Sequence, residues 1–141
     1  GMRSFGPVRA SQYGGADYTS KANGEIIVMA MIETKEGLAN LEAICATPGL
    51  DAVYIGPSDL SYALDLEPRG DNPDPLHIET CNKILKTAHD NGIKAVMHCA
   101  GSEFAVGAAE RGFDMVMLTS DLACMTASSK MQLENFKKNA K

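Results

Sequence analysis

The chain has 141 residues and a mass of 15.0 kDa, which suffices for one domain with a hydrophobic core but not for two ordinary ones. Hydrophobic residues make up 45% and charged residues 22%, a globular composition that argues against disorder. No apolar run is long enough to cross a bilayer, and a net charge of −5 without a basic cluster argues against nucleic acid as a partner. We therefore expect one cytoplasmic domain that binds neither membrane nor nucleic acid.

Two sets of side chains have no predicted chemical role. The four cysteines form no CxxC pair and lie in apolar stretches, which favours small core residues in a reducing compartment over disulfides or a zinc site. They are Cys45, Cys81, Cys99 and Cys124. His77 and His89 fall on an amphipathic stretch, and we expect both on the solvated surface.

The sequence predicts a single domain over residues 1–141. Residues 1–24 form a leading loop with a short helix around residues 17–22, and residues 25–141 form four strand-helix units. The predicted strands cover residues 25–32, 52–55, 93–97 and 113–118, the first of them buried on both faces. The predicted helices begin at the N-cap Thr34, near Leu76, at the N-cap Ser102 and at the N-cap Asp121.

Alternating strands and helices require parallel strands, because tight turns cannot join parallel neighbours. An open doubly wound sheet and part of a (β/α)8 barrel both satisfy this pattern. An open sheet usually carries a glycine-rich phosphate turn after its first strand, and Glu33-Thr34-Lys35 is not such a turn. A full barrel needs about 250 residues, so four units would supply half of one.

Chemistry in parallel α/β folds gathers at the carboxyl ends of the strands. This chain places there Glu33, Gly56-Pro57-Ser58-Asp59, His98 and Thr119-Ser120-Asp121. The carboxylates of Glu33 and Asp59 could hold a hard divalent cation such as Mg²⁺, Mn²⁺ or Co²⁺. Simpler interpretations stay open: Glu33 as a charge that complements a helix dipole, Ser58 or Asp59 as an N-cap, and His98 as a hydrogen-bonded rim residue.

Two motifs carry a family resemblance. Met31-Ile-Glu-Thr34, followed by Val53-Tyr-Ile-Gly-Pro-Ser-Asp-Leu-Ser61, resembles the HpcH/HpaI family of metal-dependent pyruvate aldolases. The segments Arg3–Ala10 and Ser120-Asp121-Leu122 are similar to the family's arginine- and glycine-containing loop and its final strand end. The resemblance implies a (β/α)8 TIM barrel, of which this chain supplies about the last four β/α units, the C-terminal half.

The resemblance also implies a function and a set of site residues. Glu33 and Asp59 would be the metal ligands, for Mg²⁺, Mn²⁺ or Co²⁺ as cofactor. The substrate-binding residues would be Gly56, Pro57, Ser58, Asp59 and His98. The implied reaction is the reversible cleavage of 2-oxo-4-hydroxy acids to pyruvate and an aldehyde. The family's catalytic base and its arginine belong to the first half of the barrel, so no catalytic residue is identified in this chain.

Alternatives remain at the level of the whole chain. It could be a truncated piece, a half barrel completed by a second chain, or a domain that lost catalysis. The competing functions are a non-catalytic remnant that binds metal and oxoacid, and a carbon–carbon lyase acting on an acyl-thioester, as in citrate lyase β-type relatives. Two open sheet edges predict self-association, so we expect a homo-oligomer.

Overall fold

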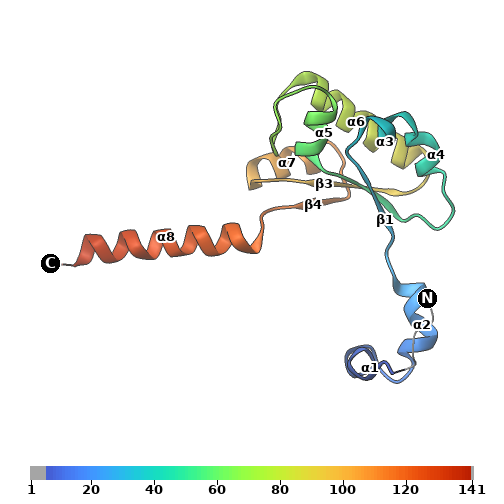
Figure 1. Ribbon diagram of the computed structural model, residues 1–141, viewed down its shortest axis with the longest axis horizontal. Coiled ribbons are helices and arrows are strands. Elements are labelled where there is room, and N and C mark those ends of the chain that lie inside the picture. The colour runs from blue at the N-terminus through green and yellow to red at the C-terminus, as the bar shows by residue number, and fades with distance from the viewer. Residues whose placement is uncertain (1–5, 141) are drawn as a thin grey trace.

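The computed structural model describes residues 6–140 and contains a four-stranded parallel sheet. Its strands are β1 (Met29–Ile32), β2 (Ala52–Ile55), β3 (Lys94–His98) and β4 (Met115–Met117). They lie in chain order, each pairing with the next, and helices connect them (Figure 1). The predicted alternation of parallel strands and helices is confirmed, and the bounds of β2 are those predicted.

The connecting helices lie on one side of the sheet (Figure 1). They are α3 (Lys35–Ala39), α4 (Leu41–Cys45), α5 (Pro57–Ala63), α6 (Pro75–Asp90) and α7 (Ser102–Glu110). Thr34 caps α3 as predicted, because its hydroxyl accepts a hydrogen bond from the Gly37 amide at 2.9 Å. Gly101 precedes α7 without a side-chain cap, so the prediction of Ser102 as an N-cap is wrong.

The core lies between the sheet and these helices. Every second strand residue points to it, and Ile32, Val53, Ile55, Ala95 and Met97 are all buried there. The helices contribute Leu41, Cys45, Leu60, Ile84 and Ala108, among others. One face of the sheet therefore has the apolar cover that a parallel sheet needs.

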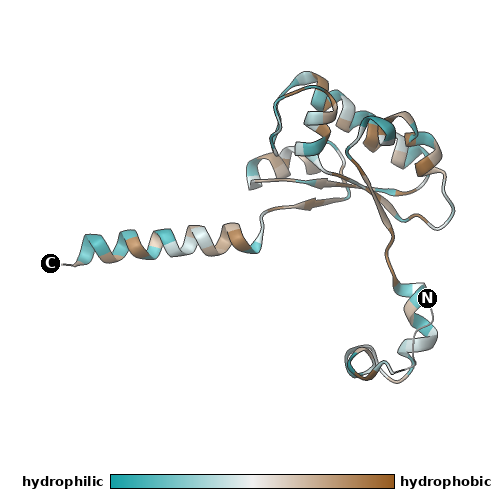
Figure 2. Ribbon diagram, in the orientation of Figure 1, coloured by the Kyte–Doolittle hydropathy of each residue, from teal (hydrophilic) through white to brown (hydrophobic). Residues whose placement is uncertain are grey.

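The opposite face of the sheet is uncovered within residues 6–140. Met29, Met31 and Met115 on this face are 40%, 56% and 48% exposed. The prediction of a first strand over residues 25–32, buried on both faces, is therefore wrong: Glu25 ends a helix, and the strand begins only at Met29. Figure 2 shows that the strands are mostly hydrophobic, a composition that suits side chains packed inside a closed barrel.

Three helices lie away from the sheet (Figure 1). They are α1 (Val8–Gly14), α2 (Tyr18–Glu25) and α8 (Asp121–Asn139), and none contains a buried residue. Helix α1 replaces part of the predicted leading loop, and Ser120, not Asp121, caps α8 through the Ala123 amide. Residues 1–5, including the start of the Arg3–Ala10 motif, lie outside the described residues. No helix within residues 6–140 is long and apolar enough to span a bilayer.

Two expectations about individual side chains are corrected. His77 is completely buried rather than solvated, because α6 turns it toward the start of α5, whereas His89 is exposed as expected. Cys45, Cys81 and Cys99 are buried, but Cys124 is exposed because α8 packs on no other described element.

Asp114 ties the beginnings of β3 and β4 together. Its carboxylate accepts hydrogen bonds from the Lys94 ammonium at 2.8 Å, the Ala95 amide at 2.9 Å and His89 Nε2 at 2.9 Å. Burial alone would raise the pKa of Asp114, but these hydrogen bonds and the charge of Lys94 outweigh burial and hold the pKa well below its usual range. The ionised carboxylate therefore stabilises the folded chain.

We expect Asp114→Asn to lower the free energy of unfolding by about 1 kcal/mol near pH 7. A carboxyl group whose folded pKa is depressed stabilises the fold above its unfolded pKa of about 4, and this stabilisation is lost as the pH falls below it. Urea unfolding measures the free energy of unfolding of the wild type and of Asp114→Asn at each pH. The difference between the two proteins should therefore be smaller near pH 3 than near pH 7. A difference independent of pH would contradict this prediction, and Asp90→Asn, on the exposed Lys86–Asp90 pair, is the control.

Candidate functional site

The two predicted carboxylates lie together at the carboxyl edge of the sheet. Glu33 follows β1 directly, and Asp59 lies in the first turn of α5, immediately after β2. A Cβ added at Gly56 would collide with Oε2 of Glu33, so the glutamate side chain lies directly against the backbone at the end of β2. Only a glycine at position 56 permits this close approach.

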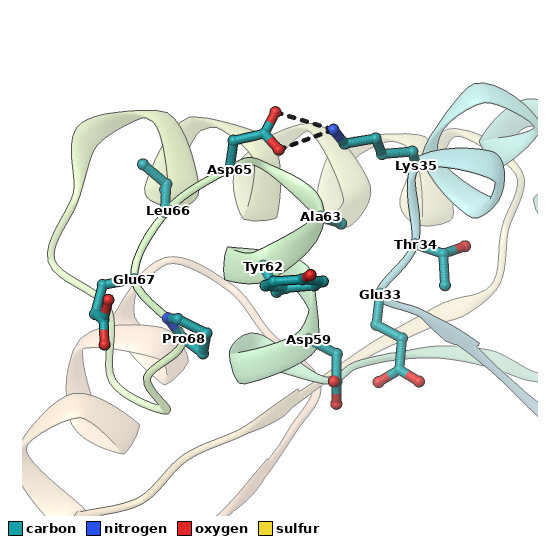
Figure 3. A pocket seen from close by; sticks show the side chains of 10 residues that line it. All are labelled: Glu33, Thr34, Lys35, Asp59, Tyr62, Ala63, Asp65, Leu66, Glu67 and Pro68. Atoms are coloured by element: carbon teal, nitrogen blue, oxygen red, sulfur yellow. Dashed lines mark hydrogen bonds and ion pairs between the residues drawn. The ribbon is translucent and has the colours of Figure 1, made fainter.

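Two negatively charged side chains lie close together at this edge of the sheet. Figure 3 shows the carboxyl groups of Glu33 and Asp59 beside each other. Burial, and after it the negative charge of Asp59, raises the pKa of Glu33. A bound cation would relieve this repulsion and favour the ionised form of both groups.

A small hollow at this edge brings the predicted site residues together. Its lining residues are Met31, Glu33, Tyr54, Gly56, Pro57, Ser58, Asp59 and His98. No lysine or arginine is among them, and the hollow has a volume of about 230 Å³. Since a water molecule occupies about 30 Å³ in the liquid, the hollow has room for a small organic acid.

A larger groove of about 800 Å³ meets the small hollow at the two carboxylates. Besides Glu33 and Asp59, residues from α5 and the loop after it line this groove, and Figure 3 shows them. Lys35 and Asp65 form an exposed ion pair there, with the ammonium nitrogen 2.9 Å from a carboxylate oxygen. The site can therefore be reached from a groove wide enough for a second, larger group.

Buried hydrogen bonds hold the Gly56–Asp59 turn from behind. The Pro57 carbonyl oxygen accepts from the Ser61 hydroxyl at 2.7 Å and from His77 Nε2 at 3.2 Å. Burial lowers the pKa of His77 and outweighs this hydrogen bond, so the ring is held neutral. Asn72 extends the network by donating to the Ser61 hydroxyl at 2.9 Å.

Of the simpler interpretations, the N-cap role of Ser58 or Asp59 is wrong, whereas His98 is hydrogen-bonded as the alternative predicted. The N-cap of α5 is Gly56 and no side chain caps it, so Ser58 and Asp59 are not N-caps. His98 is hydrogen-bonded, since its Nδ1 lies 2.7 Å from the Tyr54 hydroxyl. Residues 119–121 after β4 are exposed and line neither hollow.

Tyr54 is the site residue that sequence reasoning missed. It was expected only as part of a strand, yet it lines the hollow and bonds to His98. One signal was available: Tyr54 stands two positions before Gly56, which directly follows β2, so alternation along the strand turns Tyr54 away from the core residues Val53 and Ile55. Its proximity to His98 depends on the pairing of β2 with β3, which the sequence does not state.

The donor set fits a hard divalent cation. Among residues 6–140, no three His, Cys, Asp or Glu side chains gather as a potential metal site, so Glu33 and Asp59 would offer an ion two ligands and not a closed cage. Carboxylate oxygens with open coordination positions suit Mg²⁺, Mn²⁺ or Co²⁺, which commonly retain water or substrate ligands. A structural zinc site would need four protein ligands.

Comparison with known proteins gives a consistent family. A sequence profile of the HpcH/HpaI aldolase/citrate lyase family matches residues 2–127. The chain is 35% identical over 130 residues to the hydroxypyruvate/pyruvate aldolase of Rhizorhabdus wittichii, and this alignment covers 92% of this chain and 52% of that protein. It is 31% identical over 131 residues to the 5-keto-4-deoxy-D-glucarate aldolase of Escherichia coli O157:H7, covering 92% and 50% of the two chains.

The structural comparison agrees. A HpcH/HpaI aldolase/citrate lyase family protein from Burkholderia cenocepacia J2315 superimposes with a TM-score of 0.78 and 25% identity, over 97% of this chain and 53% of that one. The chain therefore spans about half the length of the relatives it matches. The predicted fold, half of a (β/α)8 TIM barrel, is confirmed.

We expect Asp59→Asn to lower the pKa of Glu33 without returning it to its ordinary value, because burial, the larger cause of the shift, remains. A carbon-detected NMR titration of the Glu33 carboxyl group measures this. Asp65→Asn removes a carboxylate from the same groove and should leave the pKa of Glu33 in place. An unchanged Glu33 pKa in Asp59→Asn would show that the two carboxylates do not interact.

Proposed function

Because the chain belongs to the HpcH/HpaI aldolase/citrate lyase family, we propose that it forms the metal- and oxoacid-binding half of an aldolase site. The whole site would reversibly cleave 2-oxo-4-hydroxy acids to pyruvate, or a similar 2-oxo acid, and an aldehyde. The observation that carries this proposal is the Glu33–Asp59 pair, two like charges beside each other in a hollow lined by no lysine or arginine. The names of the aldolase relatives support the reaction class.

In this proposal Glu33 and Asp59 hold Mg²⁺, Mn²⁺ or Co²⁺. When bound, such an ion supplies Lewis acidity at the keto oxygen, so that the carbon next to the keto group can carry negative charge. Gly56 keeps the space across the end of β2 open for Glu33, and the buried bonds to the Pro57 carbonyl fix the turn that carries Asp59. The two ligands are thus held by backbone rather than by long flexible loops.

The acid itself would be bound by the start of α5. The backbone N–H groups of Ser58 and Asp59 are in the first turn of this helix, where N–H groups have no carbonyl partner within the helix. They would donate to the substrate carboxylate. We assign the proton transfers to residues outside this chain. Each of its three histidines is already engaged: His77 is buried behind the turn, His89 pairs with Asp114, and Nδ1 of His98 is hydrogen-bonded to the Tyr54 hydroxyl.

Two other functions are weighed against this one. A remnant without catalysis would bind metal and oxoacid through the same residues but would not exchange substrate protons. Carbon–carbon lyase chemistry on an acyl-thioester is ranked lower, because neither hollow offers a basic cluster for the phosphates of coenzyme A; Lys35 is paired with Asp65.

We expect Glu33→Gln and Asp59→Asn each to weaken Mn²⁺ binding by roughly 100-fold or more, because each removes one of two ionic ligands. Glu36→Gln, on the exposed first turn of α3, is the matched control and should bind normally. Calorimetry with Mn²⁺ measures the affinities. Wild-type affinity in both site variants would remove the metal assignment.

Pyruvate in deuterium oxide with Mg²⁺ then tests the chemistry by NMR. Because the proton transfers are assigned to residues outside this chain, we expect the chain alone to bind pyruvate without exchanging its methyl protons. Mg²⁺-dependent loss of the methyl proton signal, absent in Glu33→Gln, would show that this chain or a second copy of it supplies a base, and would contradict that assignment.

We further propose that the uncovered sheet face drives self-association when this chain is alone in solution. Met31→Lys should weaken the association seen by light scattering, because it places a charge on that face. Val106→Lys is the control, since Val106 is 58% exposed, close to the 56% of Met31, but lies on α7 on the covered side. A chain that is monomeric at all concentrations would contradict this proposal.

A further inference from the structure

A hydrogen-bonded pair of side chains lines the same small hollow as the two carboxylates. The Tyr54 hydroxyl on β2 lies 2.7 Å from Nδ1 of His98 on β3, and the rings meet edge to face with centroids 6.0 Å apart. Both side chains line the hollow that contains Glu33 and Asp59. They are polar groups on a sheet face that otherwise carries mainly methionines, so they need an explanation beyond packing.

The hydrogen bond determines what His98 can offer to a ligand. Burial, and secondarily the charge of Cys99, raises the pKa of Tyr54, so the phenol keeps its proton and can donate. The other acceptor near it is the Met117 sulfur at 3.9 Å, which is long and weak. Donation from Tyr54 to Nδ1 would leave the hydrogen of a neutral imidazole on Nε2. That N–H has no hydrogen-bond partner within the part of the chain that the structure describes.

The location of His98 decides which part of a substrate it meets. It lines the small hollow with the two carboxylates and is absent from the larger groove that Tyr62 and Glu67 line. A 2-oxo acid held at Glu33 and Asp59 uses its keto and carboxylate oxygens there. Different 2-oxo acids share these oxygens and differ in the substituent on the carbon next to the keto group. This substituent is the variable group that would still lie in the small hollow.

We propose that Tyr54 and His98 select a 2-oxo acid that carries a hydroxyl on the carbon next to the keto group, as in hydroxypyruvate, over one with an alkyl group there. This inference rests on the proposed function of the site. His98 is the specificity-determining residue, because its Nε2–H donates to that hydroxyl. Tyr54 is a positioning residue, which fixes the ring and its tautomer. An alkyl group in the same place cannot accept a hydrogen bond from this N–H, so the interaction that favours the hydroxyl is lost.

The tautomer can be tested without metal or substrate. Long-range proton–nitrogen NMR spectra of the chain with labelled histidine separate the two neutral tautomers, and His98→Gln identifies the His98 signals. We expect the Nε2–H form in the wild type and a mixture of tautomers in Tyr54→Phe. Tyr13→Phe, at an 80% exposed tyrosine, is the matched control. A wild-type His98 in the Nδ1–H form would overturn the proposal.

The selectivity is tested by binding to the Mn²⁺-loaded protein. Hydroxypyruvate and 2-oxobutanoate have nearly the same shape and differ by a hydroxyl in place of a methyl, so the ratio of their affinities isolates one hydrogen bond. We expect a preference for hydroxypyruvate of roughly tenfold in the wild type. It should disappear in His98→Leu, fall partly in Tyr54→Phe, and be retained in part by His98→Gln, whose amide can donate from nearly the same position.

The outcomes separate this inference from the proposed function. If the loaded wild type binds both acids with equal affinity, the selectivity role of Tyr54 and His98 is wrong and the metal and oxoacid site stands. If neither acid binds, the proposed function fails and this inference fails with it. An unchanged preference in His98→Leu, measured on a variant with a native-like NMR spectrum, would assign the selectivity to other residues and also overturn the proposal.

Discussion

The carboxylate of Glu33 lies against the backbone at Gly56, and this close approach is possible only because residue 56 has no side chain. Parallel pairing of β1 with β2 places the ends of the two strands at one edge, and the stiff Pro57 that follows starts α5 at once, so Asp59 comes beside Glu33. The two negative charges are therefore held together by backbone geometry. The closeness of the two carboxylates depends on this constraint, and so does the cation binding that we propose for them.

One face of the sheet is buried and the other is exposed, and the site lies at the edge where the two faces meet. Helices α3 to α7 bury one face, whereas Met29, Met31 and Met115 on the other remain exposed. Water reaches the hollow from this open face and weakens every electrostatic interaction in it. Cover on that face would strengthen the Glu33–Asp59 and Tyr54–His98 interactions without changing a residue of this chain. The fold of the relatives, which are about twice as long, has room for such cover.

The features that could be predicted from sequence are those set by local pattern. Ala52–Ile55 is a short β-branched run between turn signals, and its strand bounds were predicted as observed. Glu33 and Asp59 could be placed at one edge because strands alternate with helices, which fixes the direction of every strand. Features set by pairing register or by packing could not be predicted. His77 fits the polar side of an amphipathic helix in sequence, yet the carbonyl of Pro57 provides it with a buried partner.

The same distinction explains why we propose binding residues within this chain and assign the proton transfers to residues outside it. Glu33 and Asp59 lie within one strand-helix-strand unit, and His98 follows on the next strand, so adjacent parallel strands alone determine their geometry. A base must approach the substrate from across the hollow, where this sheet has no further strand among residues 6–140. In the proposed function, chelation and recognition of an oxoacid would thus be local properties of three neighbouring strands. Catalysis would require groups on opposite sides of the hollow, and for that reason would depend on closure of the sheet.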